Sequence, residues 1–160
     1  MSCKLNNNKV DMESSTGGNY EKYNQKTKSR FYQDFVYRKV YRNNKRVSAG
    51  HTEHEIEECY NHLTSVGTMD GTRQPDFRRF ESIYILKDIL TNNSCQNCNN
   101  HYVWKKQEKY LKEKIFCPDT GYLIILIERK FVYKFVSAYV IEKDSKKKAL
   151  IEEYARFKNP

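Results

Sequence analysis

Two histidines three residues apart, in the string GHTEHE, are the first residues whose types could do chemistry. Side chains at this spacing occupy neighbouring positions of one helical turn, and an unperturbed imidazole titrates near neutral pH. His51 and His54 are therefore candidates for a general acid and a general base. The alternative is the polar, exposed start of a helix. The spacing differs from H-E-x-x-H, the helical motif of zinc proteases, which argues against a protease.

Cysteines and histidines at metal-ligand spacing form a second group. Cys59-x-x-His62 and Cys95-x-x-Cys98 together supply four ligands of the kind that bind structural zinc, with His101 three residues further on. The alternative is free thiols in turns and on helix faces, which the odd count of five cysteines also fits. A zinc ion would join the Asn-rich loop to the preceding helix and take no part in catalysis. We expect no other cofactor.

A pair of hydroxyl side chains, Ser137 and Tyr139, is the third candidate. Residues 122–127, with the sequence YLIILI, are continuously apolar, which indicates a central strand covered on both faces. The segment after the next turn alternates, and the connection is too short for a crossover helix, so the two strands should form an antiparallel hairpin. Strict alternation then places both hydroxyls on the same face as Tyr133 and Phe135.

Two helices are expected ahead of these strands. Residues 52–64 are predicted to be helical, with Thr52 as the N-cap and Glu55 at the capping-box position. A second helix is predicted to begin at Pro75-Asp76, since an aspartate caps well and an apolar stripe at helical spacing follows.

The remaining elements complete an α+β pattern. Residues 30–47 are compatible with a short helix or an edge strand, and residues 66–74 are predicted to be a loop. Four strands and a closing helix follow, at residues 102–106, 110–117, 122–127, 131–141 and 143–158. The expected fold is therefore α+β, a four-stranded antiparallel sheet with N-terminal helices and a C-terminal helix.

Length and composition indicate one small basic domain. The chain has 160 residues, the usual size of one domain, and residues 1–28 are so rich in Asn, Lys, Ser and Gly that we expect a disordered arm before a single domain at 29–160. Twenty-nine Lys and Arg against 20 Asp and Glu leave a charge of +9, which attracts phosphate backbones; a merely solvated basic surface is the alternative. No apolar run approaches the roughly 20 residues of a membrane span, and no signal segment is evident, so we expect a soluble, cytoplasmic protein without a membrane partner.

Five strings in a fixed order resemble one nuclease superfamily. They are RQPDFRRFESIYILKDIL at 73–90, Val103-Trp104, YLIILIERK at 122–130, FVSAYVIE at 135–142 and KKKALIEEY at 146–154. This half of the chain, residues 73–158, resembles phage-associated nucleases of the barnase, EndoU, colicin and RelE-like (BECR) superfamily. The resemblance implies a metal-independent endoribonuclease, a toxin or effector of a phage or other mobile element. Its substrate would be RNA such as tRNA, and an immunity or antitoxin protein would be a partner. The alternative is a phage protein that binds RNA or protein on a nuclease-like scaffold without catalysis, stabilised or not by zinc.

The resemblance also implies site residues. Arg79 and Lys114 would stabilise the phosphate, with Arg129 as a further clamp, while the 2′-hydroxyl attacks in line. Ser137 would bind the phosphate or orient the attacking hydroxyl, and Tyr139 would act as the acid or stack on a base; their alternatives are a small residue beneath a helix and a core aromatic. Further RNA contacts are expected at Arg78, Lys112, Lys146, Lys147 and Lys148.

Overall fold

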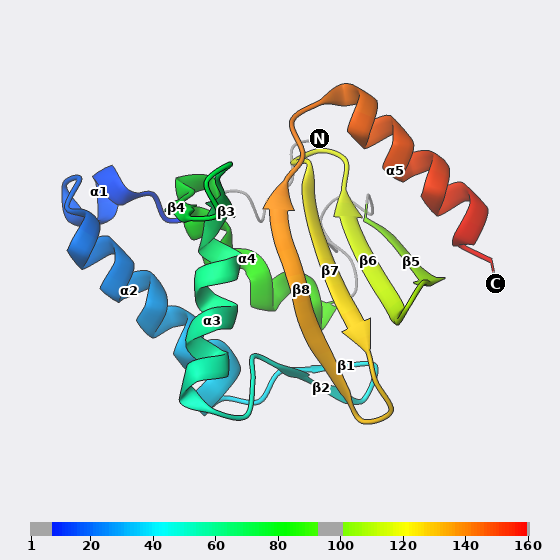
Figure 1. The fold of residues 1–160 in the computed structure, drawn as a ribbon, viewed down its shortest axis with the longest axis horizontal. Coiled ribbons are helices and arrows are strands. Elements are labelled where there is room, and N and C mark those ends of the chain that lie inside the picture. The colour runs from blue at the N-terminus through cyan, green and yellow to red at the C-terminus, as the bar shows by residue number, and fades with distance from the viewer. Residues whose placement is uncertain (1–7, 93–100, 160) are drawn as a thin grey trace.

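The computed structural model describes residues 8–92 and 101–159, and Figure 1 shows how its elements are arranged. The helices are α1 Met12–Thr16, α2 Tyr20–Tyr32, the π-helical turn η2 Gln33–Tyr37, α3 Glu53–Thr64, α4 Phe77–Asn92 and α5 Asp144–Phe157. The strands are β1 Tyr41–Arg42, β2 Lys45–Ser48, β3 Ser65–Gly67, β4 Arg73–Pro75, β5 Tyr102–Gln107, β6 Leu111–Cys117, β7 Tyr122–Glu128 and β8 Val132–Val140.

The main sheet is mixed and has six strands, in the order β1-β2-β8-β7-β6-β5. The prediction of a four-stranded antiparallel sheet is therefore wrong. Strands β5 to β8 do form an antiparallel meander, but a hairpin of β1 and β2 extends it, and β2 runs parallel to β8 with Val47 opposite Tyr133. A second sheet of β3 and β4 occupies the expected loop. The missed strands have two to four residues, too few for an alternating pattern to show.

Two asparagines make the turn between β1 and β2. Asn43 and Asn44 have φ angles of 49° and 63°, in the left-handed region that a tight two-residue hairpin turn requires at both central positions. Asparagine tolerates this region better than most residues do. The Asn-Asn pair is thus the local signal for the hairpin inside a segment that otherwise reads as either helix or edge strand.

The sheet curls back on itself, and a buried ion pair joins its distant parts. Arg42 on β1 and Glu113 on β6 lie four strand positions apart, which in a flat sheet is about 19 Å at roughly 4.8 Å per strand. Their side chains nevertheless meet, with Arg42 Nε 2.6 Å from a Glu113 carboxylate oxygen. Arg42 also donates from Nη1 to the Leu90 carbonyl at 3.0 Å, which secures the end of α4.

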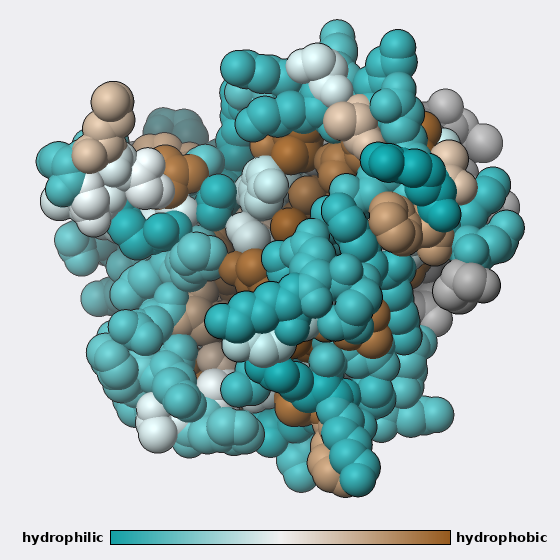
Figure 2. Space-filling model, turned by 45° about the vertical axis from the view of Figure 1, so that its right-hand side comes forward, coloured by the Kyte–Doolittle hydropathy of each residue, from teal (hydrophilic) through white to brown (hydrophobic). Residues whose placement is uncertain are grey.

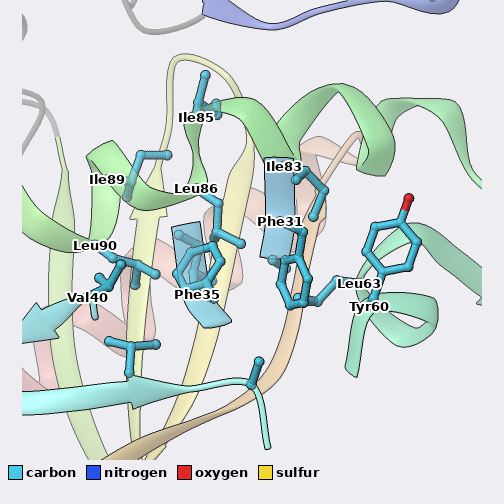
Figure 3. Packing of buried hydrophobic residues seen from close by; sticks show 14 of the residues in the cluster. Phe31, Phe35, Val40, Tyr60, Leu63, Ile83, Ile85, Leu86, Ile89 and Leu90 are labelled. Atoms are coloured by element: carbon cyan, nitrogen blue, oxygen red, sulfur yellow. The ribbon is translucent and has the colours of Figure 1, made fainter. Parts of the chain in front are cut away.

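The main core lies between this curled sheet and helices α2, α3 and α4. Figure 3 shows Phe31, Leu63 and Ile83, one from each of these helices, packed together. All three are essentially inaccessible to solvent. Burying a side chain of this size contributes about 1.5 to 3 kcal/mol, so the helices are held mainly by this layer. Within residues 8–92 and 101–159, no helix is both long and apolar enough to cross a membrane.

The expectation of a disordered arm does not hold for the part of residues 1–28 that is described. Helices α1 and α2 begin there, capped by Asp11 and Asn19, whose side chains accept from Ser14 N and Lys22 N. Tyr23 is fully buried and donates to the Val10 carbonyl at 2.6 Å. The residues that anchor α2 in the core are few and mostly aromatic. The Asn- and Lys-rich sequence around them made their helical spacing hard to recognise.

Local signals for α3 and α4 are confirmed. The Thr52 hydroxyl accepts from Glu55 N at 3.2 Å, and the Glu55 carboxylate accepts from Thr52 N at 3.1 Å, which completes the capping box. Asp76 caps α4 by accepting from Arg78 N at 3.0 Å. These bonds satisfy backbone donors that a helix start leaves free, and they depend only on residues two or three positions apart.

Strand β8 contains a bulge that changes which residues share a face. Ile125 pairs with Ser137 and Leu126 with Phe135, so Val136 is the extra residue. Phe135 therefore packs toward the helical core, whereas Tyr139 packs against a second cluster on the opposite face. The prediction that Ser137 and Tyr139 share a face with Tyr133 and Phe135 is wrong, because a bulge interrupts the period of two.

Candidate functional site: a cleft beside the bulge of strand β8

A cleft of about 680 Å³ lies between α3 and β8. It is lined by residues 48–51, one side of α3, Arg73 and residues 134–136. Strand β2 pairs with β8 only as far as Ser48 opposite Lys134, and the chain then turns into α3. Among the described residues, no strand covers the β8 edge past that point. In the view of Figure 2 the surface is mostly hydrophilic, with hydrophobic side chains between hydrophilic ones near the middle.

A glycine allows α3 to start at the cleft wall. Gly50 has a φ of 144°, which L side chains rarely adopt. A Cβ atom there would lie 2.7 Å from the Glu55 Cβ and 3.0 Å from helix backbone atoms. Only glycine fits so close to the first turn of a helix without displacing it. The turn at Gly50 thus carries His51 to the cleft just before the helix begins.

His62 lines the cleft, and its surroundings there lower the pKa of its imidazole. Burial lowers its pKa first, and the positive charges of Arg73 and Arg79 lower it further, while a hydrogen bond with the Val136 backbone acts in the opposite direction. The imidazole is therefore neutral at neutral pH, as a general base must be. Val136 is the extra residue of the bulge, so the bulge itself helps to position this ring.

Two arginines converge on the last turn of α3. Arg73 donates from Nε to the Ser65 hydroxyl at 2.9 Å and from Nη2 to the Ser65 carbonyl at 2.8 Å. Arg79 donates from Nη1 to the His62 carbonyl at 3.2 Å. Carbonyl groups at a helix end lack helical partners, so guanidinium groups are well placed there. The arrangement brings two fixed positive charges next to a neutral imidazole.

Of the residues that the nuclease resemblance implies, the structure brings two into contact. The Arg79 guanidinium lies 5.1 Å from the centre of the Tyr139 ring. Ser137 lies two residues before that tyrosine, past the bulge. Arg129 precedes β8, about 30 Å along the chain from Tyr139 at roughly 3.3 Å per residue, and its guanidinium stacks 4.2 Å from the Tyr110 ring centre. It therefore belongs to the other end of the sheet.

Lys114 lies on the far side of the sheet, beneath α5. Its Nζ is 2.6 Å from the Glu153 carboxylate, which also accepts from Trp104 Nε1 at 2.9 Å. The side chain of Lys114 is only 12% exposed. This lysine thus anchors α5 to β6, and a phosphate would have to displace a bonded carboxylate to reach it.

The two histidines that lie three residues apart in the sequence, His51 and His54, do not share a site. His51 lines the cleft, whereas His54 does not and instead contacts Glu58 at 3.3 Å with an 81% exposed side chain. His51 precedes the N-cap Thr52 and so lies outside the helix whose periodicity would have paired it with His54. The second imidazole of the cleft is His62, which the sequence suggested only as a zinc ligand. Arg73 was missed because it lies in a stretch that was predicted to be a loop.

The zinc hypothesis falls partly outside the described residues. Of the four predicted ligands, Cys95 and Cys98 are among residues 93–100, outside the described residues, and Cys59 and His62 are described, as is His101. Burial raises the pKa of the Cys59 thiol to about 12. In the described part of the chain, no group of three or more His, Cys, Asp or Glu side chains could hold a metal ion.

The other predicted RNA contacts are scattered. Arg78 pairs with Glu142, and Lys112 pairs with Glu108. The lysines at 146–148 lie in the first turns of α5, where the first and third are exposed. None of these residues lines the cleft.

We found no family model, curated protein or solved structure that matches this chain. The resemblance to BECR nucleases thus remains a prediction from its residues.

Proposed function

We propose that this protein is a metal-independent endoribonuclease whose active site is the cleft between α3 and β8. The observation that carries the proposal is the position of two guanidinium groups beside the neutral His62 imidazole. Arg73 and Arg79 donate to the His62 backbone carbonyl at 3.4 and 3.2 Å, and their charges lower the pKa of the ring. A neutral base beside fixed positive charge suits a reaction in which a proton is removed from a hydroxyl and negative charge grows on a phosphate. A second imidazole, His51, lines the same cleft.

In this reaction each side chain of the cleft has one role. His62 takes the proton of an RNA 2′-hydroxyl, whose oxygen attacks the adjacent phosphorus. His51 gives a proton to the 5′-oxygen as its bond to phosphorus breaks. The products are a 2′,3′-cyclic phosphate and a 5′-hydroxyl. Arg73 and Lys134, which both line the cleft, stabilise the charge on the phosphoryl oxygens.

Arg79 is a positioning residue in this scheme. It does not line the cleft, and it holds the His62 carbonyl while its guanidinium lies against the Tyr139 ring. Its side chain is only 13% exposed and lies outside the cleft lining, and its charge lowers the pKa of the His62 imidazole. Tyr139 keeps that guanidinium in place from the strand side.

The two carboxylates of the cleft are already engaged. Glu55 accepts from the backbone N–H groups of His51 and Thr52, and these bonds lower its pKa. Glu58 contacts His54. Neither carboxylate therefore needs a bound cation. Arg73 uses Nε and Nη2 for its bonds to Ser65 and the His62 carbonyl, which leaves its Nη1 and the Lys134 ammonium to contact a phosphate.

The test is cleavage of end-labelled RNA in EDTA, with His62→Gln and His54→Gln compared. Both substitutions remove one imidazole from α3, but only His62 lines the cleft. We expect His62→Gln to lower the rate by about 100-fold or more, the usual contribution of a general base, and His54→Gln to change it less than twofold. A single 2′-deoxy nucleotide at the cut site should block cleavage. Intact RNA with the wild type, or equal rates for both variants, would contradict the proposal and favour a binding protein without catalysis.

A further inference from the structure

The turns of two adjacent hairpins form a basic and aromatic surface at one end of the sheet. With the strand ends that flank them, they are residues 105–112, where β5 turns into β6, and residues 128–131, where β7 turns into β8, and we call them the basic end. The turns lie together because Lys112 pairs in register with Ile127. In Figure 1 both turns are at the lower end of the sheet.

The basic end concentrates the charge of the chain. Its 12 residues contain six lysines and arginines and two glutamates, which is a net charge of +4, while the whole chain of 160 residues carries +9. Nearly half of the excess charge is therefore in two turns. Like charges so close together raise the free energy of the folded state, and an anionic partner would relieve that repulsion.

The carboxylates of the basic end are already neutralised. Glu128 binds Lys45 and Lys105, at 2.5 and 2.7 Å. Glu108 pairs with Lys106 and Lys112. In residues 8–92 and 101–159, no carboxylate lies within ion-pair distance of the exposed cations Lys109, Arg129 and Lys130.

These three cations instead lie against aromatic rings. Arg129 is 4.2 Å and Lys109 is 5.5 Å from the centre of the Tyr110 ring, and Lys130 is 5.1 Å from that of Phe131. Phe131 is 77% exposed at the tip of its hairpin. The surface thus combines flat stacking groups with unpaired positive charges at close spacing.

We infer that the basic end is a binding surface for single-stranded nucleic acid, separate from the cleft. Phosphates would contact Lys109, Arg129 and Lys130, and unpaired bases would stack on Phe131 and on the guanidinium plane above Tyr110. A double helix hides its base faces and fits this surface less well. An anionic membrane is disfavoured because Phe131 is the single aromatic side chain that projects strongly here, too little apolar area for stable insertion. The inference does not depend on cleavage, since binding needs neither His62 nor a 2′-hydroxyl.

The experiment measures fluorescence anisotropy of a labelled single-stranded DNA, which lacks the 2′-hydroxyl. The variant Lys109→Gln/Arg129→Gln/Lys130→Gln is compared with Lys22→Gln/Lys26→Gln/Lys39→Gln, which loses the same charge from exposed positions on α2 and just after η2. We expect the first triple variant to reduce the slope of log K against log salt by about 2, at roughly 0.7 per phosphate contact in single strands, and the second to change it far less. Equal losses would show that only overall charge matters and would overturn the inference.

A second comparison tests stacking. Phe131→Ala should weaken binding at least about fivefold, the lower limit for loss of one stacked base, whereas Tyr37→Ala, which removes another highly exposed aromatic ring from η2, should not. Duplex DNA should bind more weakly than the single strand. Binding of anionic lipid vesicles that depends on Phe131, without binding of single strands, would instead make this a membrane surface. Cleavage by the cleft is scored separately, so either proposal can fail while the other stands.

Discussion

Breaking the buried ion pair between Arg42 and Glu113 should destabilise the fold far more than breaking a surface pair on the same strand. The two side chains are 1% and 3% exposed and 2.6 Å apart. Glu113→Gln keeps the size of the side chain and removes its charge, so the Arg42 guanidinium is left buried without a counterion. Loss of one partner of such a pair costs about 3 to 5 kcal/mol.

This loss of stability corresponds to a measurable fall in the melting temperature. For a domain of this size, 1 kcal/mol corresponds to about 2 to 4 °C, so the midpoint should fall by roughly 6 to 20 °C. Lys112→Gln is the control, because its pair with Glu108 is partly exposed, at 28% and 34%, and such pairs contribute about 0 to 1 kcal/mol. Both variants remove one charge from neighbouring residues of β6.

A double substitution separates the cost of leaving one charge unpaired from the cost of replacing the two side chains. Arg42→Met with Glu113→Leu removes both charges and should recover much of the loss, since an apolar replacement of a buried pair is often neutral or stabilising. Thermal and urea unfolding give the free energies for the cycle. A cost below about 1 kcal/mol for Glu113→Gln would refute the view that this pair holds β1 across the curl of the sheet. No recovery in the double variant would refute the view that the cost comes from an unpaired buried charge.

Three further predictions concern pH and packing. Cleavage should increase with pH through the lowered pKa of His62, because the base must be neutral, and Arg73→Gln should move this rise to higher pH in a pH–rate profile, since it removes a charge that lowers that pKa. Glu153→Gln should lower stability in urea more than Glu152→Gln, as only Glu153 binds α5 to the sheet. Burial raises the pKa of Glu153, but its hydrogen bonds with Lys114 and Trp104 lower it by more, so the pKa in the folded state lies below the ordinary 4.5. The difference in stability between the two variants should therefore vanish as the pH falls below 4.5 and through that lower pKa. Asn19→Ala should cost about 0.5 to 2 kcal/mol by removing the cap of α2, measured by thermal melting.

Elements that depend on near neighbours could be read from the sequence. The capping box at Thr52 and Glu55 involves residues three positions apart, and the start of α4 depends on Asp76 and the donors that follow it. The meander of β5 to β8 has short turns and strands of six to nine residues, long enough for a pattern to show. In each case the stabilising contacts are local or lie between consecutive strands, so the pattern along the chain already contains them.

Other features required the tertiary structure, because their partners are distant in the chain. The parallel pairing of β2 with β8 joins residues 46–48 to 132–134, and the curl of the sheet is what brings Arg42 to Glu113. Nothing near either residue indicates the other.

The cleft is the clearest case of a site that the sequence could not locate. A single extra residue in β8, Val136, reverses the faces that strict alternation predicts and directs its backbone toward His62. Arg73 reaches the same place from a two-stranded sheet of three-residue strands. The positive charge of the chain, the helices α3, α4 and α5 and the four long strands could be predicted from the sequence alone, whereas α1 and α2 could not. Only the packing of α3 against the open edge of β8 decided which charged groups meet, since their pKa values and partners depend on contacts that form after the chain has folded.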